Sequence, residues 1–233
     1  RDLPPPGAPA EVPKTQGYAP STPVAPPREV VPPDAAKPVN RTPTADERRR
    51  LTERAITDME DQAAAYLLRE EYENAVAALD IILEDSEDDE VRRAARTFKE
   101  FVAQVADLPG AVASVLRLKS GEDLTVRYRG KPVTGRLMSA SGGQIELEET
   151  LDQNGTIIKR RHSIAMTEVD ALDRARWLGD GTSPARKAML FVLAWRSRQP
   201  ETVLSQLAAQ SGALSGAFQR RMESMASARS GPP

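Results

Sequence analysis

The stretch from Leu118 to Asp173 limits the possible folds more than any other part of the chain. Its apolar residues alternate with polar ones, as at Leu124, Val126 and Tyr128, and it is rich in turn-forming glycines. Alternation with a period of two indicates strands that have one buried and one solvent-facing side. We therefore predict a small β-barrel here, with helical segments before and after it.

Glycines mark the turns between the predicted strands. Asn154-Gly155 is the strongest of these signals, because both central residues of a type I′ hairpin turn need positive φ. Tight hairpins that join five short strands would close a strongly bent barrel and leave few exposed edges. The predicted strands centre on residues 124–128, 133–137, 145–147, 156–161 and 163–172.

The first 43 residues hold 13 of the 19 prolines and few large apolar side chains. Proline disrupts helices and cannot donate a backbone hydrogen bond to a sheet, and the segment has too little apolar surface to offset the entropy of ordering. We predict a disordered, extended linker over residues 1–43 that acts as a tether, with docking of proline-recognising domains as the alternative. Because the chain begins with Arg1 rather than methionine, we expect it to be a fragment of a longer protein.

Helical periodicity dominates the segments on both sides of the barrel. Thr44 and Glu47 form a capping-box pattern that predicts a helix start, and a second such pattern begins at Ser86. Ser183-Pro184 predicts another helix start, because serine caps helices and proline suits the first helical position. The predicted domains are a linker over 1–43, a three-helix segment over 44–109, a barrel over 110–181, a C-terminal helical segment over 182–228 that packs with 44–109, and a disordered tail over 229–233. The fold class is α+β.

Overall charge gives no general attraction to nucleic acid or anionic lipid. The chain has 32 Lys and Arg residues against 34 Asp and Glu residues. It has no cysteine, which excludes disulfides and thiolate metal sites. No apolar run reaches the length of roughly 20 residues that a membrane span requires. We expect a soluble chain, placed outside the cytoplasm if a membrane span lies upstream of Arg1, and its location is otherwise open.

The barrel segment resembles the Sm-like fold, in which a helix precedes a five-stranded bent sheet, with an SH3-like barrel as the near alternative. The likeness rests on Leu124–Tyr128, on Val133–Leu137 with Gly135 at the point of curvature, on Ile145–Leu147 and on a terminal strand near Val169–Leu172. Members of the Sm-like family that bind RNA carry Asp and Asn after that glycine, where this chain has Ser139 to Gly143. The resemblance therefore implies the fold more than RNA binding.

The helical run around Tyr72, Ala75 and Leu79 resembles the junction of a tetratricopeptide repeat over about one repeat length. In that family a large and a small residue let two antiparallel helices approach closely. The whole layout also resembles accessory regions of large bacterial multidomain proteins, including certain serine/threonine kinases. This resemblance implies a role in binding or positioning proteins.

Six residues of the barrel are candidates for a polar binding surface, and they are Arg127, Arg129, Lys159, Arg160, Arg161 and His162. A basic stripe of this kind would suit phosphate groups, but residues 110–181 contain 11 Lys and Arg against 10 Asp and Glu and lack aromatic stacking platforms on the polar face. We therefore expect a mixed, solvated surface and regard nucleic-acid binding as unlikely.

No catalytic pattern occurs in the sequence. His162 is the only histidine, and its neighbours Arg160 and Arg161 would repel a proton from it. The acidic run over residues 84–90 lacks the central glycine of a calcium loop, so we predict a solvated helix start and no metal or cofactor. We predict a chain that is not an enzyme, although a catalytic domain upstream is possible.

The predicted function is a non-catalytic protein-interaction or scaffolding module at the end of a flexible tether. Its protein partners are unidentified, and a homo-oligomer is also possible. The alternative, from a different class, is an Sm-like nucleic-acid-binding domain.

Overall fold

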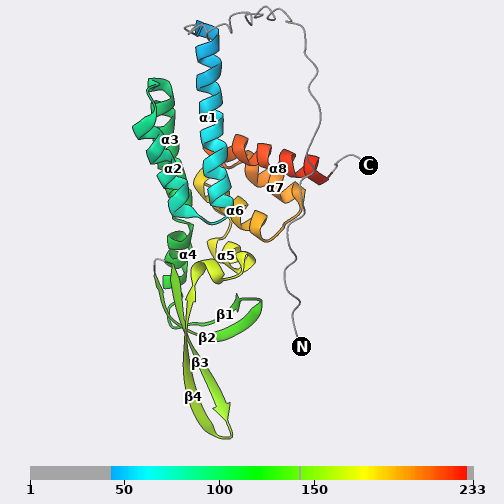
Figure 1. Cartoon of the computed structure of the whole chain (residues 1–233). Helices are drawn as coiled ribbons and strands as arrows, with labels where there is room; N and C mark the ends of the chain where they lie inside the picture. The colour runs from blue at the N-terminus through cyan, green and yellow to red at the C-terminus, as the bar shows by residue number, and fades with distance from the viewer. Residues whose placement is uncertain (1–42, 142, 230–233) are drawn as a thin grey trace, which may run out of the picture. The chain divides into compact units, whose positions relative to one another are not determined.

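The computed structural model describes residues 43–141 and 143–229. The linker predicted over residues 1–43 thus lies outside the described residues except for Pro43, and so does the tail predicted over 229–233 except for Arg229. In the described part, helices precede and follow one antiparallel sheet (Figure 1). The α+β fold class is therefore confirmed.

The described residues form eight α-helices, two single turns of 3-10 helix and four strands. The helices are α1 (Ala45–Leu68), α2 (Tyr72–Asp85), α3 (Asp89–Ala106), α4 (Leu108–Arg117), α5 (Ala171–Leu178), α6 (Pro184–Arg196), α7 (Glu201–Ala209) and α8 (Ser215–Arg229). The strands are β1 (Asp123–Tyr128), β2 (Lys131–Ser141), β3 (Gln144–Gln153) and β4 (Thr156–Ala165). The 3-10 turns are η1 (Met166–Glu168) and η2 (Gly212–Leu214).

Helix α1 begins at the predicted capping box. Thr44 Oγ1 accepts a hydrogen bond from the Glu47 N–H at 3.2 Å, and Glu47 Oε2 accepts one from the Thr44 N–H at 2.7 Å. The hydrogen bond from the Thr44 backbone lowers the pKa of the Glu47 carboxyl. Helix α2 then folds back along α1 after a turn at Glu70, where φ is 63°, and buries Ala75 and Leu79 completely.

The start and the end of α3 differ from the prediction. Its N-cap is Asp88 rather than Ser86, because Asp88 Oδ1 accepts the Glu90 N–H at 2.8 Å. The helix ends at Ala106, before the predicted stop at Pro109-Gly110. Pro109 instead lies in the first turn of α4, where proline is tolerated because first-turn N–H groups have no acceptor within the helix.

The sheet has four antiparallel strands in the order β1-β2-β3-β4, so the prediction of five strands was wrong. Val169 forms only an isolated bridge with Tyr128 of β1, and Asp170 then caps α5 by accepting the Leu172 N–H at 2.8 Å. A capped helix thus replaces the terminal strand predicted near Val169–Leu172. The resemblance to the Sm-like and SH3-like folds stays a prediction.

Gly135 of β2 lies close to the backbone of β3 at Glu148 and Glu149. A Cβ atom at this position would sit 2.9 Å from the Glu148 carbonyl oxygen and 3.1 Å from the Glu149 nitrogen. Both atoms belong to the backbone, so no side-chain rotation could relieve such a contact. Glycine is therefore required here for the two strands to approach each other.

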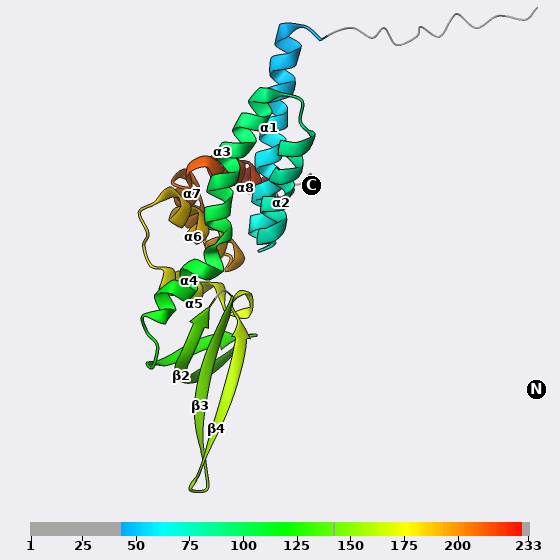
Figure 2. The same cartoon turned by 90° about the vertical axis from the view of Figure 1, so that its left-hand side faces the viewer.

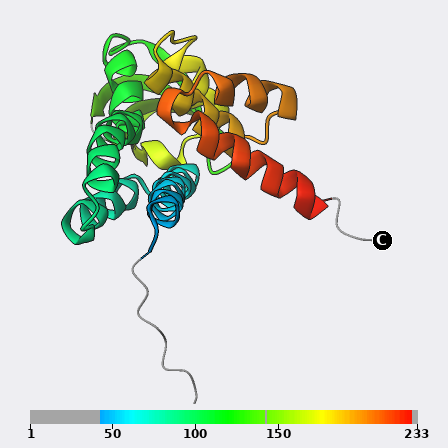
Figure 3. The same cartoon turned by 90° about the horizontal axis from the view of Figure 1, so that it is seen from above.

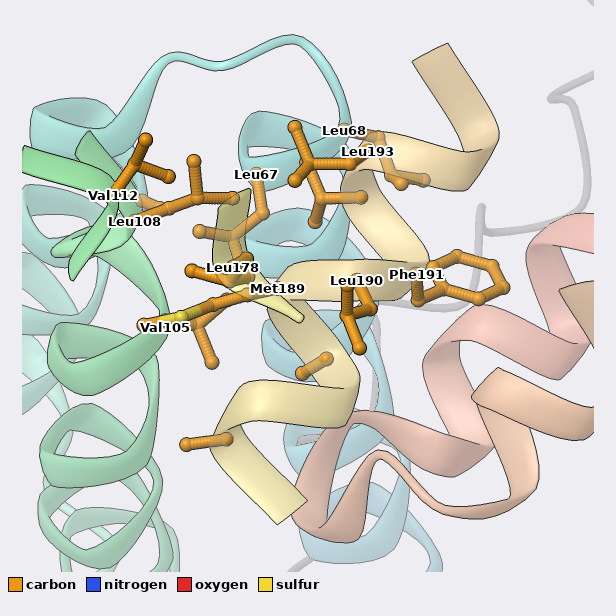
Figure 4. Packing of buried hydrophobic residues seen from close by; sticks show 14 of the residues in the cluster. Leu67, Leu68, Val105, Leu108, Val112, Leu178, Met189, Leu190, Phe191 and Leu193 are labelled. Carbon is orange, nitrogen blue, oxygen red and sulfur yellow. The ribbon is translucent and has the colours of Figure 1, made fainter. Parts of the chain in front are cut away.

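Helices α4 and α5 lie between the sheet and the remaining helices (Figures 1 and 2). Seen along α1, the pair α2 and α3 and the pair α7 and α8 lie on different sides of α1 (Figure 3). The C-terminal helices contact α1 and α3, and buried side chains from several helices meet around Leu67, Val105, Leu108, Leu178 and Met189 (Figure 4). The same cluster includes buried residues of the sheet, such as Leu137 and Ile164, so the helices and the sheet share one core.

Candidate interaction surface

The distal part of the β3–β4 hairpin is the most exposed part of the sheet. Pairing of β2 with β3 ends at Arg136 and Glu148, whereas β3 and β4 remain paired as far as Gln153 and Thr156. We call residues 149–160 the arm; here each strand has only the other as a neighbour. The arm points away from α4 and α5 (Figures 1 and 2). Its turn has φ of 55° at Asn154 and 85° at Gly155, as the hairpin signal predicts.

Two large apolar side chains lie on the arm without cover. Ile157 is 69% exposed and Ile158 is 40% exposed. Ile158 pairs with Leu151, and both lie on the side of the sheet that buries Leu147 and Ile164 nearer the helices. The side of the sheet that is buried near the helices is therefore exposed to solvent along the arm.

Three of the four candidate basic residues on β4 contact acidic residues on β3. Lys159 Nζ lies 2.8 Å from Glu148 Oε1, and Arg161 Nε lies 3.9 Å from Glu148 Oε2. The hydrogen bond from Lys159 lowers the pKa of the Glu148 carboxyl. Arg160 is exposed and forms no ion pair with a described residue. The cations thus form a row along the outer strand of the sheet.

His162 Nε2 lies 2.8 Å from Glu149 Oε2. Sequence reasoning missed this carboxylate, although counting back from the Asn154-Gly155 turn places Glu149 opposite Arg160 and therefore diagonally across from His162 on the same face. Among the described residues, Glu149 is the only side chain that hydrogen-bonds the imidazole, so the arrangement lacks a nucleophile beside the base.

Arg127 and Arg129 lie at the other edge of the sheet, on β1 and in the turn that follows it. Arg129 forms an ion pair with Glu168 and lies over the Tyr128 ring, with 5.0 Å between the guanidinium carbon and the ring centroid. The Arg127 N–H donates to Asp173 Oδ2 at 2.8 Å. The structure therefore divides the six candidate residues into two groups, and only those on β4 form a continuous row.

A groove of about 590 Å³ lies between α6, α7 and α8. Trp195, Leu204, Met222 and Met225 supply its apolar lining, and Arg198 lies at its rim. Leu204 is buried and Met225 is 38% exposed. The methionines therefore contribute both to the core and to the lining of the groove. Helical spacing in the sequence does not distinguish these two roles.

A buried polar junction joins the turn between α1 and α2 to α5 and α6. Arg174 Nη1 lies 2.6 Å from Glu70 Oε1, and Arg196 Nη2 lies 3.7 Å from Glu70 Oε2. Tyr72 Oη lies 3.5 Å from Glu70 Oε1, and burial together with this carboxylate raises the pKa of the Tyr72 phenol. Arg174 Nε has no hydrogen-bond acceptor among the described residues. No sequence pattern indicates this junction, because Arg174 and Arg196 lie far from Glu70 in the chain.

Within residues 43–141 and 143–229, no group of three or more His, Cys, Asp or Glu side chains is arranged to hold a metal ion. In the same residues, no helix combines the length and apolar character needed to cross a bilayer. Comparison with known proteins gave no matching family model, no matching curated protein and no matching solved structure. The contacts and exposure described above are therefore the basis for a functional proposal.

Proposed function

We propose that this chain is a non-catalytic protein-interaction or scaffolding module, an accessory region that a proline-rich tether attaches to a larger bacterial protein. One observation carries the proposal: beyond the described helices, the arm exposes Ile158 on the side of the sheet that is buried nearer the helices, and Ile157 on the opposite side. Ile158 and its cross-strand partner Leu151 extend the apolar side of the sheet beyond the helices, and contiguous exposed apolar surface is typical of protein-binding sites.

The arrangement of charge supports protein binding over the nucleic-acid alternative. Glu148 partly neutralises Lys159 and Arg161 on β4, and Arg129 is paired with Glu168. A surface that tracks a phosphate backbone would instead present unpaired cations along its path. Residues 144–165 also contain no Phe, Tyr or Trp side chain on which a base could stack.

Site-specific photo-crosslinking in cells that naturally make the protein tests this proposal. A photoreactive amino acid replaces Ile157 on the arm in one variant and the exposed Arg93 on α3 in a control variant. We expect adducts with a defined protein from position 157 and none from position 93. Adducts that nuclease removes, or equal labelling from both positions, would contradict the proposal.

A gel-shift series with single-stranded RNA tests the alternative function. The proposed function predicts no shift at low or high salt. A shift that weakens steeply with salt and is lost in Arg160→Ala and Arg161→Ala would support a nucleic-acid binder.

A further inference from the structure

The outer edge of β4 is an unpaired sheet edge. In the described part of the chain, β4 is the last strand of the sheet, and its only strand neighbour is β3. An edge strand presents a row of backbone N–H and C=O groups that can pair with another extended chain. An isolated pair of strands is also only marginally stable in water, so the arm would gain stability from a third strand.

The hydrogen-bond pattern shows which residues direct their backbone groups outward. The Met166 N–H donates to the Gly143 carbonyl, which identifies this as a hydrogen-bonded pair of an antiparallel ladder. Such pairs alternate along the strands, so the even-numbered residues of β4 bond to β3. Ile157, Lys159 and Arg161 therefore present their N–H and C=O groups to the free edge.

The side chains along this edge carry an excess of positive charge. Lys159, Arg160 and Arg161 are three consecutive cations. Among the described residues, only the carboxylates of Glu148 and Glu149 lie within ion-pair distance of the basic side chains of residues 159–162. Glu148 contacts both Lys159 and Arg161, and Glu149 contacts His162. Cross-strand pairs of opposite charge stabilise a sheet, so the edge favours a strand with acidic side chains.

A second copy of this chain fits the edge poorly. Two β4 strands paired in an antiparallel manner about Arg160 would place Lys159 of each copy opposite Arg161 of the other. Like charges directly opposite each other destabilise a strand pair. In that register the charge pattern opposes self-association, whereas it favours an acidic partner.

We propose that the β4 edge binds an extended acidic segment of a partner protein by adding it to the sheet as a fifth strand. This inference rests on the proposed function and names the kind of partner that the arm takes. The antiparallel complement of residues 157–161 has acidic residues opposite Lys159, Arg160 and Arg161, followed by apolar residues opposite Ile158 and Ile157. Main-chain hydrogen bonds would supply affinity and the side-chain pairs would supply specificity.

A synthetic peptide with the sequence Thr-Glu-Asp-Glu-Val-Ile-Thr is a direct probe of this inference. Titration into the full chain, followed by NMR and amide hydrogen exchange, should slow exchange at Lys159 and Arg161 and leave Arg160 unchanged. The same peptide N-methylated at alternate residues that face β4 should bind at least about tenfold more weakly, because it cannot complete the ladder. Equal binding of the two peptides would overturn strand addition.

Two variants at one position separate backbone pairing from charge. Lys159→Gln removes the cation and keeps the N–H, and we expect it to weaken peptide binding about two- to fivefold. Lys159→Pro also removes the outward N–H, which an edge strand tolerates, and we expect a further loss of at least about fivefold. Matching thermal melts for the two variants establish that both are folded. Equal affinities of the two variants for the peptide would contradict the inference.

The remaining outcomes distinguish this inference from the proposed function. Protein adducts from position 157 without binding of the acidic peptide would leave the interaction module standing and overturn the acidic-strand inference. If neither the adducts nor binding of the acidic peptide is observed, the proposed function and the acidic-strand inference are both overturned. Sedimentation velocity at low salt should show no dimer, and a dimer that Lys159→Pro dissociates would identify a second copy as the occupant. Peptide binding that single-stranded RNA displaces at physiological salt would assign the edge to nucleic acid.

Discussion

Arg174 on α5 and Glu70 at the turn between α1 and α2 form a buried ion pair. Arg174 Nη1 lies 2.6 Å from Glu70 Oε1, and the two side chains are 2% and 5% exposed. The pair links the helix that follows the sheet to the first helical hairpin. It therefore contributes to holding the sheet and its arm relative to α1 and α2.

Glu70→Gln should destabilise the protein by about 3–5 kcal/mol, because it leaves the charge of Arg174 buried without a carboxylate. Glutamine has about the same size as glutamate and, like glutamate, carries a Cβ atom. The φ of 63° at position 70 therefore strains the turn equally in both proteins. Urea unfolding monitored by circular dichroism measures the change. Glu53→Gln is the matched control, since Glu53 pairs with Arg49 at an exposed site, and it should change stability by less than about 0.5 kcal/mol.

Arg174→Met in combination with Glu70→Gln completes a double-mutant cycle. The double variant should be more stable than the sum of the two single changes predicts, because it leaves no unpaired buried charge at Glu70 or Arg174. Strictly additive effects would show that the two side chains do not stabilise each other.

Much of the local structure could be predicted because it depends on neighbouring residues. Thr44 with Glu47 fixes the start of α1, Ser183 caps α6, and Asn154-Gly155 sets the hairpin. These signals act within a few residues through hydrogen bonds and backbone preferences. Apart from α5, the helices and the first four strands follow from them and from apolar periodicity.

The missed features depend on contacts between distant residues. Asp173 and Arg174 are charged residues that directly follow the strand predicted over residues 163–172, yet both are buried, at 6% and 2% exposure. Asp173 accepts the N–H of Arg127 on β1, and Arg174 meets Glu70. Periodicity counts such residues as solvent-facing, so it could not reveal α5 or the junction. The row of cations on β4 could be predicted, but the exposure of Ile157 depends on where β2 ends.

Gly135→Ala should destabilise the sheet by about 1–3 kcal/mol, because the added Cβ would lie 2.9 Å from the Glu148 carbonyl oxygen. Gly130→Ala is the control, since Gly130 has φ of 76° and no atom within 4 Å of the added Cβ, so it tests the backbone cost of about 1 kcal/mol alone. Urea unfolding should rank Gly135→Ala as the more destabilised variant. The reverse order would show that β2 and β3 can separate without loss.

Phe191→Ala should cost about 3–5 kcal/mol, because the ring is fully buried between α6 and α8. Its centroid lies 4.1 Å from that of Phe218, with 14° between the ring planes. Leucine at both positions keeps most of the apolar volume, so a cycle of Phe191→Leu and Phe218→Leu measures the ring contact itself. We expect a coupling of about 0.5–1.5 kcal/mol from chemical denaturation. A coupling near zero would contradict a specific contact between the rings.

Tyr72→Phe should change how stability depends on alkaline pH. Burial, with a smaller effect of Glu70, raises the pKa of the Tyr72 phenol above its ordinary value of 10.0. Above pH 10 the unfolded chain therefore releases this proton while the folded chain keeps it. The contribution of Tyr72 to the free energy of unfolding is thus fully present below pH 10 and is lost as the pH rises. The loss in the natural protein should reach up to about 1.4 kcal/mol for each pH unit above 10, relative to the variant.

Urea unfolding of both proteins at several pH values between 8 and 11 measures this difference. All other tyrosines and lysines are common to the two proteins, so their titration cancels in the comparison. Below pH 9 the two free energies of unfolding should run parallel, because the phenol is neutral in both states. Parallel curves up to pH 11 would show that the Tyr72 phenol ionises as readily in the folded chain as in the unfolded one.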